Sequence, residues 1–311
     1  MLLIATPLCN YSHMNQEFDW NDLKAFLAVM RTGRLTAAAK LMKIDHSTLG
    51  RRIVRLEEAL QTRLFDRLTV GYRPTAAGEQ LLRETENIES LTIGLQSRLT
   101  NMTSELAGAV RVAAPEGFST FFLASRIGQL TSTHPKIEFE LIAGPSVVSL
   151  SKREADMAVT NICPQKGRLH ALKLTDYELG IYASPSYLSK NSKIQNKRDL
   201  LNHNFIGYME DMLPTAEHAY LNEINKAIIP NVRISNVFTQ LAATQGGVGL
   251  CVLPCFMCAS QPNLVRILPS DIRIFRSYWL VIHSDLRELP RVRATADFII
   301  DSVRNSSQLF G

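Results

Sequence analysis

Two runs of sequence decide the fold of the N-terminal part of this chain: Leu35-Thr36-Ala37-Ala38-Ala39-Lys40-Leu41 and Asp45-His46-Ser47-Thr48-Leu49-Gly50-Arg51-Arg52-Ile53. Together they predict a short helix, a tight turn and a second helix. Asp45 takes the N-cap position of the second helix, where its side-chain oxygen can accept from the free backbone N–H groups of the first turn. The apolar residues of that helix follow a 4-3-4 spacing, which places them on one inward face: Leu49, Ile53, Leu56 and Leu60.

The outer side of the second helix is polar and basic. At about 100° per residue, the residues opposite the apolar face are Ser47, Arg51, Val54 and Glu58, with Thr48 and Arg55 beside them. The alanines at 37–39 let the two helices approach closely where they cross, although alanine also favours any helix. A basic helix presented outward in this way is suited to the major groove of DNA.

The segment from Phe18 to about Gly78 carries a longer matching string, whose further members are Leu23, Phe26, Val29, Gly33, Leu56, Glu57, Leu60, Leu64-Phe65-Asp66-Arg67 and Pro74-Thr75-Ala76-Ala77-Gly78. With the two runs above, this string resembles the N-terminal winged helix-turn-helix of the LysR-type transcriptional regulators. It departs from the family at Arg34 and Gly50, where Ser is usual. Gly50 either costs the helix about 0.5 to 1 kcal/mol relative to Ala or lets the helix approach a base pair or phosphate closely, and the sequence favours neither.

Length and charge fit a DNA-binding protein of more than one domain. The 311 residues, 46% of them hydrophobic, are enough for two or more cores. The net charge is +5; residues 19–78 hold 11 Lys and Arg against 6 Asp and Glu, whereas residues 79–311 hold 23 against 22. Nearly all the positive excess therefore lies in the helix-turn-helix segment, as expected for a surface that neutralises phosphates. No apolar run approaches 18 residues, so no membrane span is predicted.

The N-terminal residues and the cysteines indicate a cytoplasmic chain. Residues 1–18 are expected to form a tail, with Met14 as an alternative start, and the opening residues lack the basic group of a signal peptide. An odd number of cysteines without such a signal indicates reduced thiols: Cys9, Cys163, Cys251, Cys255 and Cys258. Cys255 and Cys258 have zinc-like spacing but no second pair, so they are interpreted as core residues or, alternatively, as metal or redox sensors.

The segment Phe65 to Thr75 contains Gly71 and Pro74 and predicts a short hairpin, the wing. Arg67 and Arg73 bracket this hairpin. They are interpreted either as contacts to the DNA backbone or as solvated surface residues.

A long helix without proline is predicted from Thr75 to about Glu105, with Gly108 just past its end. Four apolar residues recur every seven positions and a fifth occupies a d-like position: Leu81, Ile88, Leu95, Met102 and Leu91. The stripe is either a dimerisation seam or the inner face of a helix packed on its own domain. The resemblance implies a linker helix that pairs two protomers.

Strands and helices alternate beyond Gly108, which argues for a parallel sheet with right-handed crossovers. Strands are predicted at 110–113, 137–142, 157–159, 179–182, 205–206, 250–253 and 277–283, a turn at 115–117, and helices at 118–132, 147–152, 185–188, 237–245 and 291–303. Weaker matches in this half resemble the family's effector domain, which has two α/β lobes built like a periplasmic solute-binding protein. That resemblance implies crossovers between the lobes near 163–167 and 266–269.

The expected fold class is an α+β multidomain chain with a winged helix-turn-helix, a long linker helix and a two-lobed α/β effector domain. Its expected parts are a tail at 1–18, a DNA-binding domain at 19–77, a linker at 78–106 and a regulatory domain at 107–311, with lobe I at 107–163 and 268–311 and lobe II at 164–267.

Ligands of open α/β sheets bind beyond the carboxyl ends of the strands. The loop after the first strand offers Ser119 and backbone N–H groups to an anion or polar group, while Glu116 suggests an effector with a positive or hydrogen-donating group. The candidate effector-binding residues are Pro115, Glu116, Gly117, Phe118, Ser119, Ser146, Thr160, Asn161, Thr239 and Gln240. Each of them alone is also typical of an ordinary cap or turn.

The sequence contains no G-x-S-x-G elbow, Walker-type loop, H-E-x-x-H motif or metal-binding histidine pair, so no enzyme activity, cofactor or metal is expected. The prediction is a sequence-specific transcriptional regulator of the LysR type, modulated by a small-molecule effector bound between the lobes. The candidate DNA-binding residues are Thr36, His46, Ser47, Thr48, Arg51, Arg52, Arg67 and Arg73. The expected partners are double-stranded DNA, the effector, a second copy of the chain in a dimer or tetramer, and RNA polymerase. The rival interpretation is a solute-binding or catalytic α/β protein with a basic N-terminal interaction module.

Overall fold

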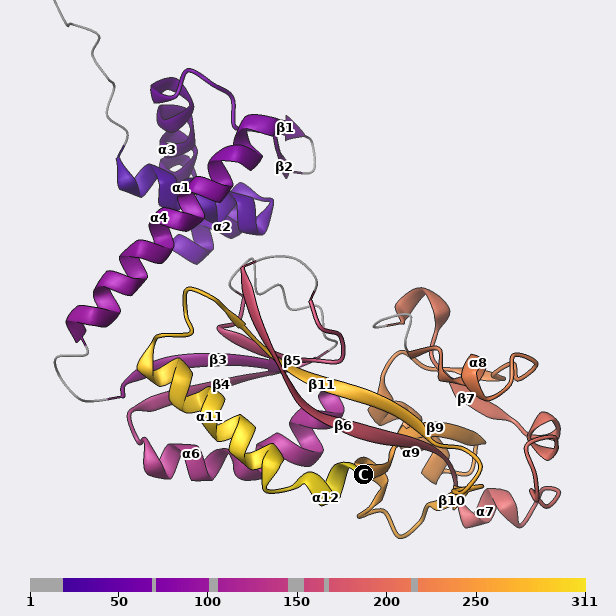
Figure 1. Ribbon diagram of the computed structural model, residues 1–311. Helices are drawn as coiled ribbons and strands as arrows, with labels where there is room; N and C mark the ends of the chain where they lie inside the picture. The colour runs from indigo at the N-terminus through magenta and orange to yellow at the C-terminus, as the bar shows by residue number, and fades with distance from the viewer. Residues whose placement is uncertain (1–18, 69–70, 101–105, 145–153, 165–167, 214–217) are drawn as a thin grey trace, which may run out of the picture. The chain divides into compact units, whose positions relative to one another are not determined.

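The computed structural model describes residues 19–68, 71–100, 106–144, 154–164, 168–213 and 218–311 (Figure 1). The chain divides into two compact units, Met1–Thr92 and Ile93–Gly311. Within the described ranges, no helix is both long and apolar enough to span a membrane.

The N-terminal unit is built from three helices, a two-stranded hairpin and most of a long fourth helix. These elements are α1 (Trp20–Thr32), α2 (Leu35–Met42), α3 (His46–Ala59), β1 (Phe65–Leu68), β2 (Gly71–Pro74) and α4 (Ala76–Thr100). The predicted apolar face of α3 is confirmed, because Leu49, Ile53 and Leu56 are buried against α1 and α2 and Leu60 is partly buried there. The helix-turn-helix therefore has its core where the 4-3-4 spacing predicted it.

The helix ends follow local capping chemistry. Asp45 caps α3 as predicted, since its carboxylate accepts from the Ser47 N–H at 2.7 Å. Gly33 ends α1 in the left-handed region, with φ 67°, and its N–H donates to the Val29 carbonyl. Arg34 stands at the N-cap of α2 without making a side-chain cap. The first helix of the helix-turn-helix motif therefore begins without the bond that a Ser at this position supplies.

The hairpin is fastened to the helices at both strands. Glu57 on α3 accepts from the backbone N–H groups of Leu64 and Phe65, at 2.8 and 3.2 Å. The Tyr72 N–H donates to the Gly33 carbonyl at 2.9 Å. Beside it, Gly71 has φ 145°, and a Cβ there would lie 2.5 Å from that same carbonyl oxygen. The predicted wing is thus confirmed, and its position depends on a glycine.

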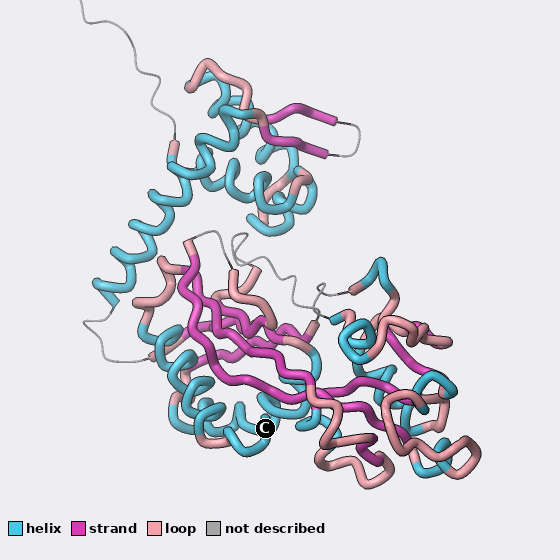
Figure 2. The backbone as a smooth tube through the Cα atoms, turned by 45° about the vertical axis from the view of Figure 1, so that its right-hand side comes forward, coloured by secondary structure: helices cyan, strands magenta, loops and turns pink. Residues whose placement is uncertain are grey.

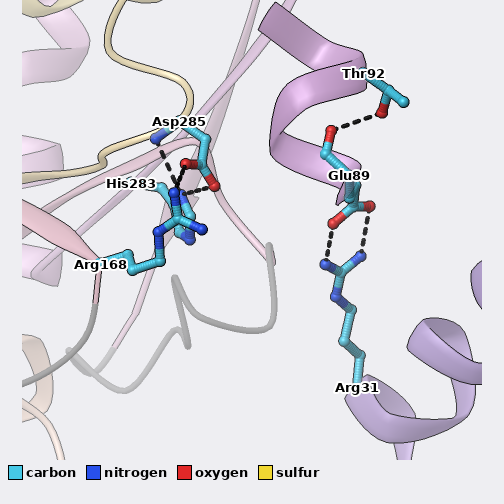
Figure 3. A network of polar contacts seen from close by, with 6 residues as sticks. All are labelled: Arg31, Glu89, Thr92, Arg168, His283 and Asp285. Atoms are coloured by element: carbon cyan, nitrogen blue, oxygen red, sulfur yellow. Dashed lines mark hydrogen bonds and ion pairs between the residues drawn. The ribbon is translucent and has the colours of Figure 1, made fainter. Parts of the chain in front are cut away.

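The long helix α4 is held on the N-terminal unit by its first turns. The Thr75 hydroxyl accepts from the Gly78 N–H at 3.1 Å and so caps the start of α4. Farther along, Arg31 on α1 forms a two-pronged ion pair with Glu89 at 2.6 and 3.2 Å (Figure 3). The predicted end near Glu105 falls in 101–105, outside the described residues.

The C-terminal unit is one mixed sheet of nine strands with helices packed against it. The strands are β3 (Gly108–Ala114), β4 (Ile137–Ala143), β5 (Met157–Thr160), β6 (Leu169–Ala183), β7 (Phe205–Gly207), β8 (Val232–Arg233), β9 (Leu250–Pro254), β10 (Val265–Ile267) and β11 (Ile274–His283). The helices are α5 (Glu116–Phe118), α6 (Ile127–Thr133), α7 (Pro185–Leu188), α8 (Tyr220–Ile224), α9 (Val237–Gln245), α10 (Cys255–Cys258), α11 (Pro290–Arg304) and α12 (Ser307–Phe310).

The sheet order is β4-β3-β5-β11-β6-β9-β7-β8, with β10 added beside β6. The expected parallel pairing is wrong in the middle of the sheet. Strand β3 is parallel to β4 and β5, and β7 is parallel to β8 and β9, but β6 and β11 are antiparallel to each other and to their outer neighbours. We call the part around β3, β4 and β5 lobe I and the part around β7, β8 and β9 lobe II.

The two long strands β6 and β11 join the lobes, running side by side through the C-terminal unit (Figures 1 and 2). Their pairing extends from Leu169 opposite His283 to Leu179 opposite Ile274, with a register shift between Tyr278 and Trp279. The chain thus passes between the lobes along these two strands, whereas the expected crossovers lay near 163–167, of which 165–167 is outside the described residues, and near 266–269. The first half of β6 alternates between exposed and half-buried residues, and this hid it from a search for apolar runs.

Ion pairs fasten the ends of these strands. Arg168 and His283 both contact the Asp285 carboxylate, at 2.9 and 3.1 Å (Figure 3). At the other end, buried Glu178 on β6 pairs with Arg273 at 2.6 Å and with Arg266 at 2.5 Å. These bonds, led by the one from Arg273, hold the pKa of Glu178 below its usual value.

Most other predicted elements are confirmed within a few residues, and α9 matches its predicted range. The expected turn at 115–117 is wrong, because Pro115 is an N-cap and a continuous helical segment runs from Glu116 to Thr133 through a π turn and a 3-10 turn. The expected helix at 147–152 lies outside the described residues.

Candidate DNA-binding surface and ligand cleft

The outer face of α3 is open. Ser47, Arg51, Val54 and Glu58 are exposed, and Thr48 is half-buried and within 3.4 Å of an Arg51 nitrogen. The predicted outward direction of this face is confirmed. It presents a guanidinium and two hydroxyls, the groups that bond to base edges in the major groove.

The base of α3 is fixed by a buried carboxylate. Arg55 donates from Nε and Nη2 to the two oxygens of Asp22 on α1, at 2.7 and 2.5 Å. Asp22 is fully buried. Sequence reasoning placed Arg55 on the flank of the outer face, but this pair occupies its guanidinium and sets the orientation of α3 on α1.

The other predicted DNA-binding residues surround this face on three elements of the same unit. His46 is exposed at the start of α3, and Arg52 is half-buried on its side. Thr36 is exposed in the first turn of α2. On the hairpin, Arg67 is exposed and Arg73 lies 3.4 Å from Asp66 across the two strands.

Gly50 faces α2. A Cβ at this position would make an ordinary contact, 3.5 Å, with Leu35 Cδ2. Because that contact is with the protein itself, the geometry favours the interpretation in which Gly50 only weakens the helix over the one in which it makes room for DNA.

The stripe along α4 divides into two parts. Leu81 packs against the core of the N-terminal unit, as expected for a helix packed on its own domain rather than for a dimerisation seam. Ile88, Leu91 and Leu95 are 39%, 68% and 53% exposed. Met102 lies outside the described residues.

A cleft of about 310 Å³ lies in the C-terminal unit, with walls from both lobes. Four of the candidate effector-binding residues line it: Pro115, Glu116, Gly117 and Asn161. They follow β3 and β5, at the carboxyl ends where ligands of such sheets bind.

The remaining candidates are used elsewhere in the fold. Phe118 is buried in a cluster of aromatic rings, and the Ser119 hydroxyl donates to the Ala114 carbonyl at 3.2 Å. The Thr160 hydroxyl donates to the Ile162 carbonyl at 2.8 Å. Thr239 is exposed in the first turn of α9, and buried Gln240 lines a neighbouring cavity of about 230 Å³ in lobe II. Ser146 lies outside the described residues.

Sequence reasoning missed the tyrosines of the cleft, which are Tyr177, Tyr208, Tyr220 and Tyr278. The rings of Tyr177 and Tyr278 stack with centroids 4.2 Å apart, and Asn161 donates to the Tyr177 hydroxyl at 2.7 Å. Burial raises the pKa of Tyr177 to about 12 and raises the pKa of the other three phenols as well. All four rings are therefore neutral at physiological pH.

Three of the cysteines, Cys251, Cys255 and Cys258, behave as apolar residues. Cys251 and Cys258 are buried, and burial raises the pKa of both thiols and of half-buried Cys255. A raised pKa keeps a thiol protonated and unreactive. Among the described residues, no group of three or more His, Cys, Asp or Glu could hold a metal ion. The core interpretation is the one that the structure favours.

Comparison with known proteins accounts for both units. Residues 20–79 match the model of the bacterial regulatory helix-turn-helix proteins of the lysR family, and residues 103–304 match the LysR substrate binding domain. The chain belongs to the LysR family of transcriptional regulators. LysR-type proteins bind DNA through the first domain and an effector through the second, so the predicted family, fold class and regulatory function are confirmed. The rival interpretation, a solute-binding or catalytic protein, is excluded.

Individual LysR-type relatives align over nearly the whole chain. The transcriptional regulator PtxR of Pseudomonas aeruginosa is 28% identical over 308 residues, which are 97% of this chain and 96% of PtxR. The fold is similar to that of ArgP from Mycobacterium tuberculosis, with a TM-score of 0.68 and 19% identity over 92% of this chain and 98% of ArgP. It is also similar to that of full-length OxyR C199D from Pseudomonas aeruginosa, with a TM-score of 0.67 and 18% identity over 93% and 98%.

Proposed function

We propose that this regulator reads its operator with Ser47, Thr48 and Arg51, which reach base edges while His46 lies at the entry of α3 into the groove. Thr36, Arg52, Arg67 and Arg73 would hold the flanking phosphates. The proposal rests on the different surroundings of two arginines on α3. The Arg55 guanidinium is paired with buried Asp22, whereas the Arg51 guanidinium has no such partner among the described residues and is exposed on the open face. Base contacts come from groups presented in this way, and phosphate contacts set the register.

The exposed part of the α4 stripe supports self-association. Ile88, Leu91 and Leu95 are exposed at spacings of three and four residues, which form one side of a helix. Pairing of two α4 helices would cover them and would place two recognition helices for two half-sites. A tetramer would follow from a second contact between dimers. RNA polymerase is the further protein partner. The cytoplasm is the proposed compartment, because the described cysteines are free thiols, as is usual in a reducing compartment.

A ligand in the cleft would act by population shift. A molecule that binds one degree of lobe closure more tightly than another stabilises that state by the difference in affinity. Closure would then change the spacing of the paired DNA-binding units and the bend of the bound DNA.

The test uses DNA selected from a random pool by the wild-type protein, and compares Arg51→Ala with Arg63→Ala. Arg63 is an exposed arginine at the α3–β1 turn and controls for the loss of one positive charge. We expect Arg51→Ala to weaken binding to the selected DNA by about 1 to 3 kcal/mol, with a smaller loss on random DNA.

Salt titration separates the two kinds of contact. If Arg51→Ala lost affinity equally on selected and random DNA, with a shallower salt dependence, Arg51 would hold a phosphate and the proposed reading role would be wrong.

A further inference from the structure

Besides the tyrosines, the titratable residues in the described lining of the cleft are Glu116 and His218. Of the Asp, Glu, Lys and Arg side chains in the described lining, only Glu116 is present. Its side chain is half-buried, and no hydrogen bond or ion pair engages it within the described part of the chain. A carboxylate in this position can pair with a ligand that brings a positive charge or several N–H donors.

The two Ser119 groups that the sequence offered to an anion are engaged within the protein. The Ser119 N–H donates to the Pro115 carbonyl at 2.8 Å, and the Ser119 hydroxyl donates to Ala114. The guanidinium of Arg276 lies 5.4 Å from the ring centre of Tyr220 and is paired with Glu223. The loop where the sequence suggested an anion therefore offers neither a spare hydroxyl nor a cation.

The tyrosines of the cleft can contact the uncharged part of a cationic ligand. Four neutral phenol rings line the cleft, and the negative quadrupole of an aromatic ring attracts cations. Glu116 comes from lobe I, and its charge adds to burial in raising the pKa of Tyr208 on lobe II. Glu116 and Tyr208 therefore line the same cleft from different lobes, close enough for the carboxylate charge to affect the phenol.

Close packing limits the size of the ligand. A Cβ on Gly117 would lie 2.7 Å from the sulfur of Met257, another lining residue, so α5 approaches α10 as closely as a glycine permits. The volume of about 310 Å³ is at the small end of the range for ligand sites.

We propose that the effector is a small organic cation, an amine with an aromatic or apolar body, whose ammonium group pairs with Glu116 while the tyrosines hold the body. This inference rests on the proposed function, because it names the ligand class of the cleft that tunes DNA binding.

The test measures binding to the full-length chain by titration calorimetry with three probes of similar shape. Phenethylamine is a cation at pH 7, 2-phenylethanol is its neutral analogue and phenylacetate is an anion. We expect phenethylamine to bind most tightly. Glu116→Gln should weaken the amine roughly tenfold or more, the size of a lost charged hydrogen bond, and leave 2-phenylethanol unchanged. Glu138→Gln, which removes an exposed carboxylate on β4, is the matched control and should change neither.

Equal or tighter binding of phenylacetate, no binding of the amine, or an amine affinity that Glu116→Gln leaves unchanged would overturn the assignment. DNA retardation by the same protein preparation keeps the two proposals apart. If DNA is bound and the amine is not, the ligand class is wrong; if DNA is not bound, the regulatory role proposed for α3 is wrong.

Discussion

Gly50→Ala is expected to stabilise the N-terminal unit. The position is in the middle of α3, where alanine is favoured over glycine by about 0.5 to 1 kcal/mol because glycine has more conformational freedom to lose. The added methyl would meet only Leu35 Cδ2, at 3.5 Å, so no steric penalty opposes this gain. For a unit of this size the gain corresponds to a rise in melting temperature of about 2 to 8 °C.

The unfolding of this unit can be followed by one fluorophore. The chain has 2 tryptophans, Trp20 on α1 and Trp279 on β11. In a Trp279→Phe background, the fluorescence of Trp20 reports the N-terminal unit alone, since Trp20 packs against its core. Thermal unfolding is then compared with and without Gly50→Ala.

Gly71→Ala is the opposing control in the same unit. Its φ of 145° and the 2.5 Å approach to the Gly33 carbonyl oxygen should cost about 1 to 3 kcal/mol of stability. If Gly50→Ala lowered the melting temperature, or left it unchanged and selectively weakened DNA binding, the glycine would serve the approach to DNA and the packing argument would be refuted.

Three further outcomes are expected. Arg34→Ser should supply the missing cap of α2 and stabilise the unit by about 0.5 to 1 kcal/mol, measured by the same Trp20 unfolding. Arg55→Ala should lower the urea midpoint of unfolding because it leaves the Asp22 carboxylate buried without its partner. Adding Asp22→Asn to Arg55→Ala should recover part of this lost stability. If stability did not recover, the role given to the Arg55–Asp22 pair would be contradicted. The depressed pKa of Glu178, bonded chiefly to Arg273, stabilises the folded state above the ordinary value of 4.5, and this contribution is lost as the pH falls through the lower folded value. The melting temperatures of the wild type and Glu178→Gln, measured from pH 3 to 7, should therefore converge at the acid end. A difference that stays constant with pH would contradict the stabilising role of ionised Glu178.

Local signals explain what could be predicted in the N-terminal unit. The Asp45 cap, the spacing of the buried leucines and the glycines of the hairpin each act over a few residues, so the sequence displays them directly. The Arg55–Asp22 pair joins residues 33 positions apart. No local pattern distinguishes Arg55 from Arg51, so its structural role is visible only in the folded unit.

The residues of the cleft were harder to predict for the same reason, because many of them meet only through contacts between distant parts of the sequence. The ends of β3 and β5 were predictable, and with them Glu116 and Asn161. The tyrosines belong to the interiors of β6 and β11 and to lobe II, and they meet through pairings of strands that lie about a hundred residues apart in the sequence, such as Arg276 opposite Tyr177. Alternation in one strand predicts which residues share a face but not which other strand lies beside it.

Because β6 and β11 are paired, the connection between the lobes is a two-stranded ribbon that can twist, rather than a pair of flexible linkers. A ladder of backbone hydrogen bonds resists stretching and shear, so the softest movement available to it is twist about its own length. The register shift between Tyr278 and Trp279 interrupts the ladder and marks where such twist concentrates. Tyr278 stacks on Tyr177 and both line the cleft, so an occupant of the cleft would contact the two strands next to this register shift.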